Sequence, residues 1–246
     1  MGERGAFVGA IQANRGNGYD VCVVREGSGR EANGAQQSDG PQWAARLGPG
    51  TVPGTGVGVA GYSRELLRGA LIYAGRGIPV FPCEPHGKRP LTADGFLEAT
   101  TDGALIRRWW ARWPNANVAI PTGVRSGLLV LDVDAGEDTD SVASLELSRG
   151  QPPKTARAAT GGGGVHIYFR YPSPQELWAA GLYTKEVRNS QGLLGGGLDV
   201  RGEGGYVVAP PSSTGRAYRW IDRSPPAGAS WLLGCLKAAT SGETLF

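Results

Sequence analysis

The chain is poor in the side chains that bind zinc or form disulfides. Its 246 residues include three cysteines, Cys22, Cys83 and Cys235, and only two histidines, His86 and His166. The cysteines are far apart and form no C-x-x-C pair, so they cannot complete a standard zinc site with two histidines. Isolated cysteines are typical of a reducing compartment, and we therefore expect a cytoplasmic protein without disulfides.

Long hydrophobic runs are also missing. No apolar segment approaches the roughly 20 residues that cross a bilayer, so we expect no membrane partner. The first residues lack the apolar stretch of a secretory signal, and we expect no signal peptide. Lysine is scarce too, and arginine supplies nearly all the positive charge behind a net charge of +3. That charge is too small to indicate nucleic acid, and the arginine bias fits either phosphate binding or a GC-rich genome.

Glycine and proline, by contrast, are abundant, at 41 and 17 residues. Residues 1–60 are rich in Gly, Gln, Asn and Ser and have weak apolar periodicity, which predicts a low-complexity, disordered extension. The length suits one domain plus such extra sequence. We place the domain at residues 61–237 and a short tail at 238–246.

Helical periodicity starts at the beginning of this domain. Apolar residues recur at helical spacing after Ser63, the expected N-cap, and Gly77 is a natural stop. A second helix, capped by Thr101 or Asp102, carries one strongly apolar face. That face contains Ile106, Trp109, Trp110 and Trp113. We interpret these tryptophans as core packing and not as a base-stacking surface.

Short apolar runs bounded by glycine and proline predict strands. The expected strands lie at 78–83, 128–134, 165–171, 198–200 and 206–209, with a further short strand and turn at 117–123 and a helix near 138–149. The first of them is bounded by prolines and should lie at a sheet edge. Helices precede and interrupt the strands, which predicts the α+β class, with a mixed sheet flanked by helices.

Two carboxylates end the strand LLVLDVD at 128–134. Alternate strand residues share a face, so Asp132 and Asp134 point the same way, about 6.5–7 Å apart along the backbone. Leu129 and Leu131 then face a core. Two ionised carboxylates on one face repel each other, and a hard divalent ion such as Mg²⁺ or Mn²⁺ relieves that repulsion. The alternative to a metal site is a pair of solvated aspartates at the end of a strand.

A glycine run precedes the strand of His166. The glycines at 161–164 allow backbone amides to approach an anion, because no Cβ stands in the way. Alternation along the strand puts His166 on a polar face with Arg170, where it could donate a hydrogen bond to a phosphate. A flexible loop with a structural histidine explains the same pattern.

A third carboxylate follows a second glycine run, at 195–197. Asp199 lies in a strand with Arg201 on the same face, and it could join Asp132 and Asp134 in one cluster. Three carboxylates are a typical ligand supply for a pair of divalent ions that clamp the attacking and leaving oxygens of an in-line displacement.

The order of these motifs resembles that of archaeo-eukaryotic-type primases. The three motifs are DVD at 132–134, GVH at 164–166 and LD at 198–199, and the pattern is most similar to the bifunctional DNA primase/polymerase N-terminal (Prim-Pol) domain. Supporting segments are GIPVFPC at 77–83, GKRP at 87–90, WWARWP at 109–114, AIPTG at 119–123 and DVRGEGGYVVAPPS at 199–212. The resemblance covers about residues 64–235.

The resemblance implies roles for these residues. Asp132, Asp134 and Asp199 would hold Mg²⁺ or Mn²⁺, and His166 would contact the triphosphate of the incoming nucleotide. Weaker candidates for phosphate or template contacts are Lys88, Arg89 and Arg201. The family often has Ser two places before the histidine, where this chain has Gly164, so a hydroxyl contact is lost and the backbone amide remains.

The resemblance also implies a primase-polymerase core of RRM-like type and a template-dependent nucleotidyltransferase. Its expected partners are a DNA template and primer, nucleoside triphosphates and a replicative helicase, whose Walker A motif is not present in this sequence. Two alternatives stay open. A D-x-D pair also marks metal-dependent glycosyltransferases, which leaves His166 and Asp199 unexplained. The other alternative is a non-catalytic nucleotide- or single-stranded-DNA-binding module of a larger replication protein, against which the complete carboxylate set argues.

Overall fold

The computed structural model describes residues 59–136 and 139–242, so the predicted extension at 1–60 falls outside the described residues except for its last two positions. The helices are α1 (Val59–Gly75), the short 3-10 helix η2 (Gly95–Glu98), α2 (Gly103–Arg112), α3 (Thr139–Arg149), α4 (Pro174–Ala179) and α5 (Ser230–Ser241). The strands are β1 (Phe81–Cys83), β2 (Asn117–Pro121), β3 (Leu128–Val133), β4 (Arg157–Ala159), β5 (Val165–Arg170), β6 (Leu198–Arg201), β7 (Tyr206–Val208) and β8 (Arg219–Asp222).

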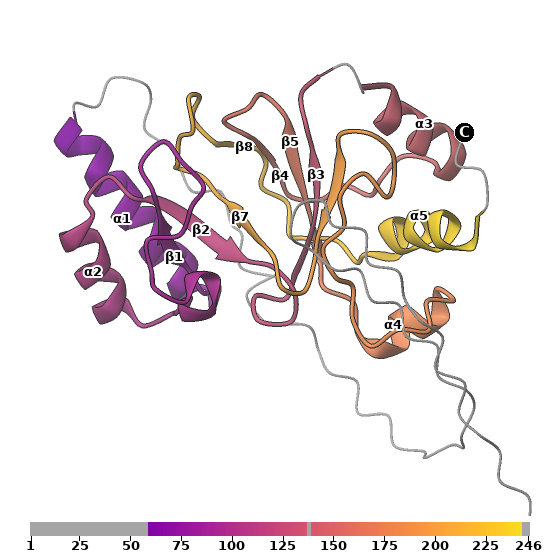
Figure 1. Cartoon of the computed structure of the whole chain (residues 1–246), viewed down its shortest axis with the longest axis horizontal. Helices are drawn as coiled ribbons and strands as arrows, with labels where there is room; N and C mark the ends of the chain where they lie inside the picture. The colour runs from indigo at the N-terminus through magenta and orange to yellow at the C-terminus, as the bar shows by residue number, and fades with distance from the viewer. Residues whose placement is uncertain (1–58, 137–138, 243–246) are drawn as a thin grey trace, which may run out of the picture.

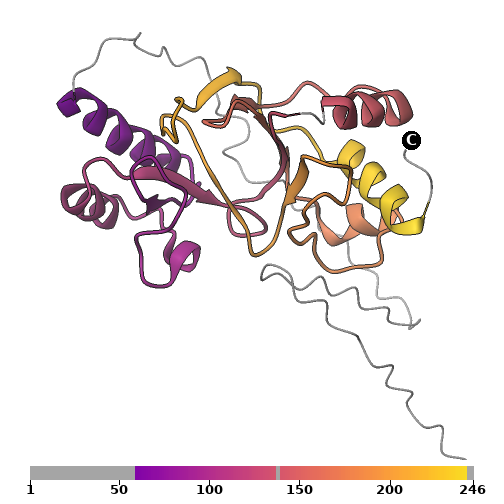
Figure 2. The ribbon, with the colours of Figure 1, turned by 45° about the horizontal axis from the view of Figure 1, so that its top comes forward.

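The strands form two sheets. A three-stranded sheet has the order β1-β2-β7, and a five-stranded sheet has the order β6-β3-β5-β4-β8. Figures 1 and 2 show α1 and α2 beside the small sheet and α3, α4 and α5 on the opposite side of the molecule. The α+β prediction is confirmed.

The sheets differ from the mixed parallel and antiparallel sheet that the sequence predicted. All neighbouring strands in both sheets are antiparallel, and parallel pairing occurs among the described residues only as isolated bridges, such as Phe169 with Ala227. The sequence predicts separate strands but not which edges meet, because strand direction depends on how the connections fold back.

Alternation along β3 and β5 divides the hydrophobic core between two faces. Leu129 and Leu131 belong to one buried cluster with Phe169, under α4 and α5. Val130 and Tyr168 point to the other face and join the cluster formed by α1, α2 and the small sheet. The five-stranded sheet is therefore covered on both sides, which explains the nearly continuous apolar run of β3.

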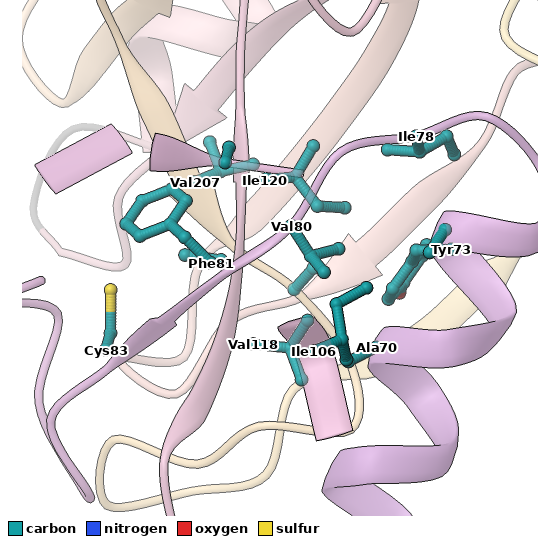
Figure 3. Close-up of a cluster of buried hydrophobic side chains, with 14 of the residues drawn as sticks. Ala70, Tyr73, Ile78, Val80, Phe81, Cys83, Ile106, Val118, Ile120 and Val207 are labelled. Carbon is teal, nitrogen blue, oxygen red and sulfur yellow. The ribbon is translucent and has the colours of Figure 1, made fainter. Parts of the chain in front are cut away.

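The second cluster explains the tryptophan face of α2. Asp102 caps this helix by accepting a hydrogen bond from the Ala104 amide at 2.7 Å. Ile106, Trp109 and Trp110 are buried, and the Trp110 indole donates to the Ala116 carbonyl at 3.1 Å. Figure 3 shows Ile106 among side chains from α1, β1 and β2. The core interpretation of this face is confirmed.

Several expected boundaries shift in the structure. Helix α1 starts at Val59, so Ser63 lies inside it and is not its N-cap; its hydroxyl donates to Asn115 Oδ1 at 2.6 Å. Helix α5 runs to Ser241 with Ala238 buried, so ordered structure continues past residue 237. The sequence analysis did not predict β4, β8, α4 or α5. The two strands in this set are too short to show a clear alternation of apolar and polar residues. None of the described helices is both long and apolar enough to span a membrane.

Candidate functional site

Asp132, His166 and Asp199 lie side by side on three neighbouring strands. In the antiparallel pairing of β3 with β5, Asp132 is the Cα partner of His166, and in the pairing of β3 with β6 it is the partner of Asp199. Partner residues in a sheet point to the same face. Three motifs that are dispersed along the chain thus form one row across the five-stranded sheet, on the face opposite α4 and α5.

Asp132 is the centre of this row. Its Oδ1 lies 3.2 Å from Nε2 of His166, and its Oδ2 lies 3.3 Å from Nη2 of Arg201. Burial opposes ionisation of Asp132, but the hydrogen bond from His166 and the charges of Arg201 and Lys88 hold its pKa below the ordinary value. Asp132 is therefore a carboxylate at neutral pH, although only 6% of the residue is exposed.

Asp199 is held by a different set of partners. Its Oδ2 accepts a hydrogen bond from Arg201 Nη2 at 2.8 Å, and its Oδ1 accepts one from the Gly192 amide at 3.1 Å. Burial raises the pKa of Asp199; Arg201 and Gly192 oppose the rise, and the charges of Asp132 and Asp134 add to it. The predicted shared face of Asp199 and Arg201 is confirmed.

The third predicted carboxylate is set apart from this row. Asp134 follows the last residue of β3 and is exposed, with its amide donating to the Gly197 carbonyl at 2.9 Å. Across residues 59–136 and 139–242, no group of three or more His, Cys, Asp or Glu side chains is arranged to hold a metal ion. The structure therefore brings Asp132 and Asp199 together, with Arg201 between their carboxylates, and leaves Asp134 at the rim.

The donor chemistry of this row nevertheless fits a hard divalent ion. Carboxylate oxygens are the ligands that Mg²⁺ and Mn²⁺ prefer. Burial is the main cause of the raised pKa of Asp199, and a bound cation would relieve the smaller contribution that comes from repulsion by Asp132 and Asp134. A cation that uses both carboxylates has to replace at least one contact of Arg201, which now neutralises them.

The glycine run before His166 allows a tight turn to pack closely against the end of β3. The Gly164 amide donates to Thr160 Oγ1 at 3.0 Å, and the Gly163 amide donates to the Thr160 carbonyl at 3.1 Å. A Cβ at Gly164 would lie 2.1 Å from the Val133 carbonyl oxygen and 3.1 Å from the Asp134 Cα. These two amides close a turn on Thr160, and Gly164 lets this turn lie directly against the end of β3.

A pocket of about 350 Å³ opens beside Asp132 and His166. One part of its lining is charged or ionisable and consists of Lys88, Asp132, His166 and Arg201. Another part is aromatic and consists of Phe96, Tyr206 and Tyr218. Four of the predicted site residues therefore meet in one pocket. Asp134, Gly164, Asp199 and Arg89 are not among its lining residues.

The two predicted basic residues of the GKRP turn differ in position. Lys88 lines the pocket, and its charge contributes to the low pKa of Asp132. Arg89 is exposed and pairs with Glu84 at 3.9 Å. Adjacent residues in an extended turn point in different directions, and the sequence alone does not tell which of the two faces the site.

Sequence reasoning missed the aromatic part of the site. Tyr206 begins β7 and stacks with Phe96 of η2 at 6.2 Å between ring centroids, with 29° between their planes. Its hydroxyl donates to the Lys88 carbonyl at 3.1 Å, which fixes the basic turn beside the pocket. Phe96 carries no signal in the sequence, because it lies in a short irregular segment that only the fold brings to β7.

A family comparison agrees with this arrangement. The model of the Prim-Pol family, described as bifunctional DNA primase/polymerase, N-terminal, matches residues 70–231. The chain belongs to the Prim-Pol family. The match spans both sheets and every residue of the pocket, and it confirms the resemblance drawn from the three motifs. A search of curated protein sequences returned no match.

Membership of the Prim-Pol family connects this chain with DNA replication of the primase/polymerase type, and it implies binding of DNA and nucleotides. The pocket is consistent with that assignment, since it combines cationic side chains for phosphates with aromatic rings for bases. Membership of the Prim-Pol family also argues against the glycosyltransferase alternative, which rested on the D-x-D pair alone.

Proposed function

We propose that this Prim-Pol domain is a template-dependent nucleotidyltransferase that adds nucleotides to a 3′-hydroxyl or joins the first two nucleotides of a primer. One observation carries the proposal: Asp132 and Asp199 are Cα partners on adjacent strands, beside a pocket that is lined by Asp132, Lys88 and Arg201. Closely spaced carboxylates next to cations are the arrangement that phosphoryl transfer requires.

In the proposed mechanism Asp132, Asp134 and Asp199 would hold Mg²⁺ or Mn²⁺. When bound, such ions would lower the pKa of the attacking hydroxyl and neutralise the departing pyrophosphate. The low pKa of Asp132 supports this role, because the residue is ionised and ready to bind a cation without first losing a proton. Asp134 is exposed directly after β3, two positions beyond Asp132.

The basic and aromatic sides of the pocket suggest how a nucleotide lies in it. Lys88 and Arg201 would contact the triphosphate, and Tyr206 with Phe96 would offer a flat surface to the base. Binding of template and nucleotide should then weaken as salt increases, because phosphate contacts release counterions. His166 lies at the base of the same pocket, where it contacts Asp132 directly.

The direct test is incorporation of labelled nucleotides on a DNA template, with Mg²⁺ or Mn²⁺, with and without a primer. We expect product from the wild type and none from the double variant Asp132→Ala/Asp134→Ala. Asp94→Asn is a matched control, because the Asp94 side chain is exposed and makes no capping hydrogen bond at η2. Product without a primer would establish priming, and synthesis retained by the double variant would overturn the proposal.

A second candidate is a non-catalytic nucleotide- or single-stranded-DNA-binding module. The observation that favours it is that Arg201 already occupies the space between Asp132 and Asp199. Under this alternative the wild type binds nucleotides or template with either metal and yields no product. Equilibrium binding of a fluorescent nucleotide, measured beside the incorporation assay, separates the two candidates.

A further inference from the structure

Both ring nitrogens of His166 have partners inside the protein. Nε2 lies 3.2 Å from Asp132 Oδ1, and Nδ1 lies 3.3 Å from the hydroxyl oxygen of Tyr168. The ring is buried, with 2% of the residue exposed. Tyr168 follows His166 by two positions on β5, so the two side chains share a face of the strand.

The donors and acceptors in this chain of contacts can be assigned from chemistry. A carboxylate only accepts hydrogen bonds, so the Asp132 contact requires a proton on Nε2. In the neutral ring the other nitrogen, Nδ1, is then an acceptor, and the Tyr168 hydroxyl is its donor. Burial raises the pKa of Tyr168 well above its ordinary value, so the phenol keeps the proton that it donates.

Tyr168 is itself held in place by a strand that carries no predicted site residue. Its ring lies 5.3 Å from that of Trp220 on β8, and 2% of the residue is exposed. Its amide donates to the Ala156 carbonyl at 2.9 Å, just before β4. A buried ring packed in this way has few rotamers, so the hydroxyl stays directed at His166.

We propose that Tyr168 is a positioning residue: its hydroxyl bonds to Nδ1 and fixes the orientation in which the His166 ring holds the Asp132 carboxylate. The consequence for synthesis rests on the proposed nucleotidyltransferase function. Removing groups that orient the ligands of a metal usually costs about 10–100-fold in activity or metal affinity. We expect Tyr168→Phe to lower kcat by about that factor and to change KM for the nucleotide little.

The first test is spectroscopic and does not depend on activity. The whole chain, labelled with ¹⁵N-histidine, has two imidazole rings, and the His86→Gln variant identifies the signals of His166. We expect long-range ¹H–¹⁵N spectra of the wild type to show His166 as the Nε2–H tautomer. The Nδ1–H tautomer would overturn the proposal even if Tyr168→Phe failed to fold.

The variants provide the second test. Tyr168→Phe keeps the ring and removes the hydroxyl, so the Nδ1 resonance of His166 should shift, while the Asp132 contact keeps the proton on Nε2. Tyr218→Phe is the matched control: its ring lies 5.9 Å from His166, but its hydroxyl accepts a hydrogen bond from Thr214 at 3.4 Å. It should leave the Nδ1 resonance of His166 unchanged. An unchanged spectrum in Tyr168→Phe would refute the positioning role, whereas a changed spectrum without any wild-type synthesis would refute only the proposed function.

Discussion

Asp132 and Asp199 face each other across β3 and β6, and one atom, Nη2 of Arg201, lies 3.3 Å from the first carboxylate and 2.8 Å from the second. Like charges directly opposite each other destabilise a pair of strands. Arg201 offsets that repulsion with its own charge. In the absence of other cations, the stability of this edge of the sheet therefore depends on Arg201.

Removal of Arg201 should destabilise the protein in a way that metal ions reverse. We expect Arg201→Ala to lower the free energy of unfolding by about 1–3 kcal/mol in metal-free buffer, because the substitution leaves two carboxylates without their cationic partner. The cost is moderate because the Arg201 side chain is partly exposed to solvent. Addition of Mn²⁺ should recover part of the loss, because a bound cation stabilises the folded state. Urea unfolding with EDTA and with Mn²⁺ measures both effects.

Arg89→Ala is the control for this experiment, because Arg89 is exposed and its distance to Glu84 is 3.9 Å. It should change the stability by less than about 1 kcal/mol under either condition. Equal losses in the two variants, or no effect of Mn²⁺ on Arg201→Ala, would contradict the role given to Arg201.

Gly164→Ala should disturb the end of β3. A Cβ at this position would lie 2.1 Å from the Val133 carbonyl oxygen, so the backbone next to Asp134 has to move. We expect a loss of about 1–3 kcal/mol in urea unfolding, the usual cost of overpacking. For Gly162→Ala, whose nearest neighbour would be Thr160 Oγ1 at 3.9 Å, we expect little loss. If both variants were equally stable, the close packing of this turn would not matter.

The buried thiol of Cys83 predicts a pH dependence of stability. Burial raises the pKa of Cys83 to about 12, against about 8.5 in an unfolded chain. The folded state keeps the proton and the unfolded state loses it, so the contribution of Cys83 is complete below about pH 8.5 and is lost as the pH rises toward 12. Relative to Cys83→Ala, the wild type should therefore lose up to about 1.4 kcal/mol per pH unit above pH 8.5.

This difference between wild type and Cys83→Ala is measured by urea unfolding from pH 7 to pH 10.5. Cys235→Ala offers a comparison, because burial raises the pKa of Cys235 to about 11, a smaller rise. A difference that stays constant over the whole range would show that the Cys83 thiol ionises freely in the folded protein.

Substitution of a buried tryptophan should destabilise the protein far more than substitution of an exposed one. Trp110 is 3% exposed and its indole bonds to the Ala116 carbonyl, so Trp110→Ala should cost about 3–5 kcal/mol. Trp178 on α4 is 67% exposed and touches Tyr183, and Trp178→Ala should cost less than about 1 kcal/mol. Thermal unfolding of both variants checks the contrast; a stable Trp110→Ala would reopen the base-stacking interpretation of α2.

Much of the fold was predictable where the chain shows strong periodicity. The strands that carry Asp132, His166 and Asp199 appear within one or two residues of their predicted limits, because apolar alternation and bounding glycines mark them clearly. The apolar face of α2 was also predicted, since helical spacing is a local property, and its cap was narrowed to Thr101 or Asp102, of which Asp102 is the one that caps. The directions of the strands and the helix α5, which packs on the five-stranded sheet, were not predicted, because they depend on contacts between distant segments.

The sequence by itself determined the candidate side chains: three carboxylates, one histidine and a few basic residues, carried by recognisable strands and turns in the order of the Prim-Pol family. Only the tertiary structure decided how these groups meet. The register of β5, β3 and β6 places Asp132 between His166 and Asp199, and it directs Arg201 and Tyr168 onto the same face. Side-chain alternation is local, whereas register is set by packing and turns along the whole sheet, and a shift of one residue would turn these groups into the opposite core.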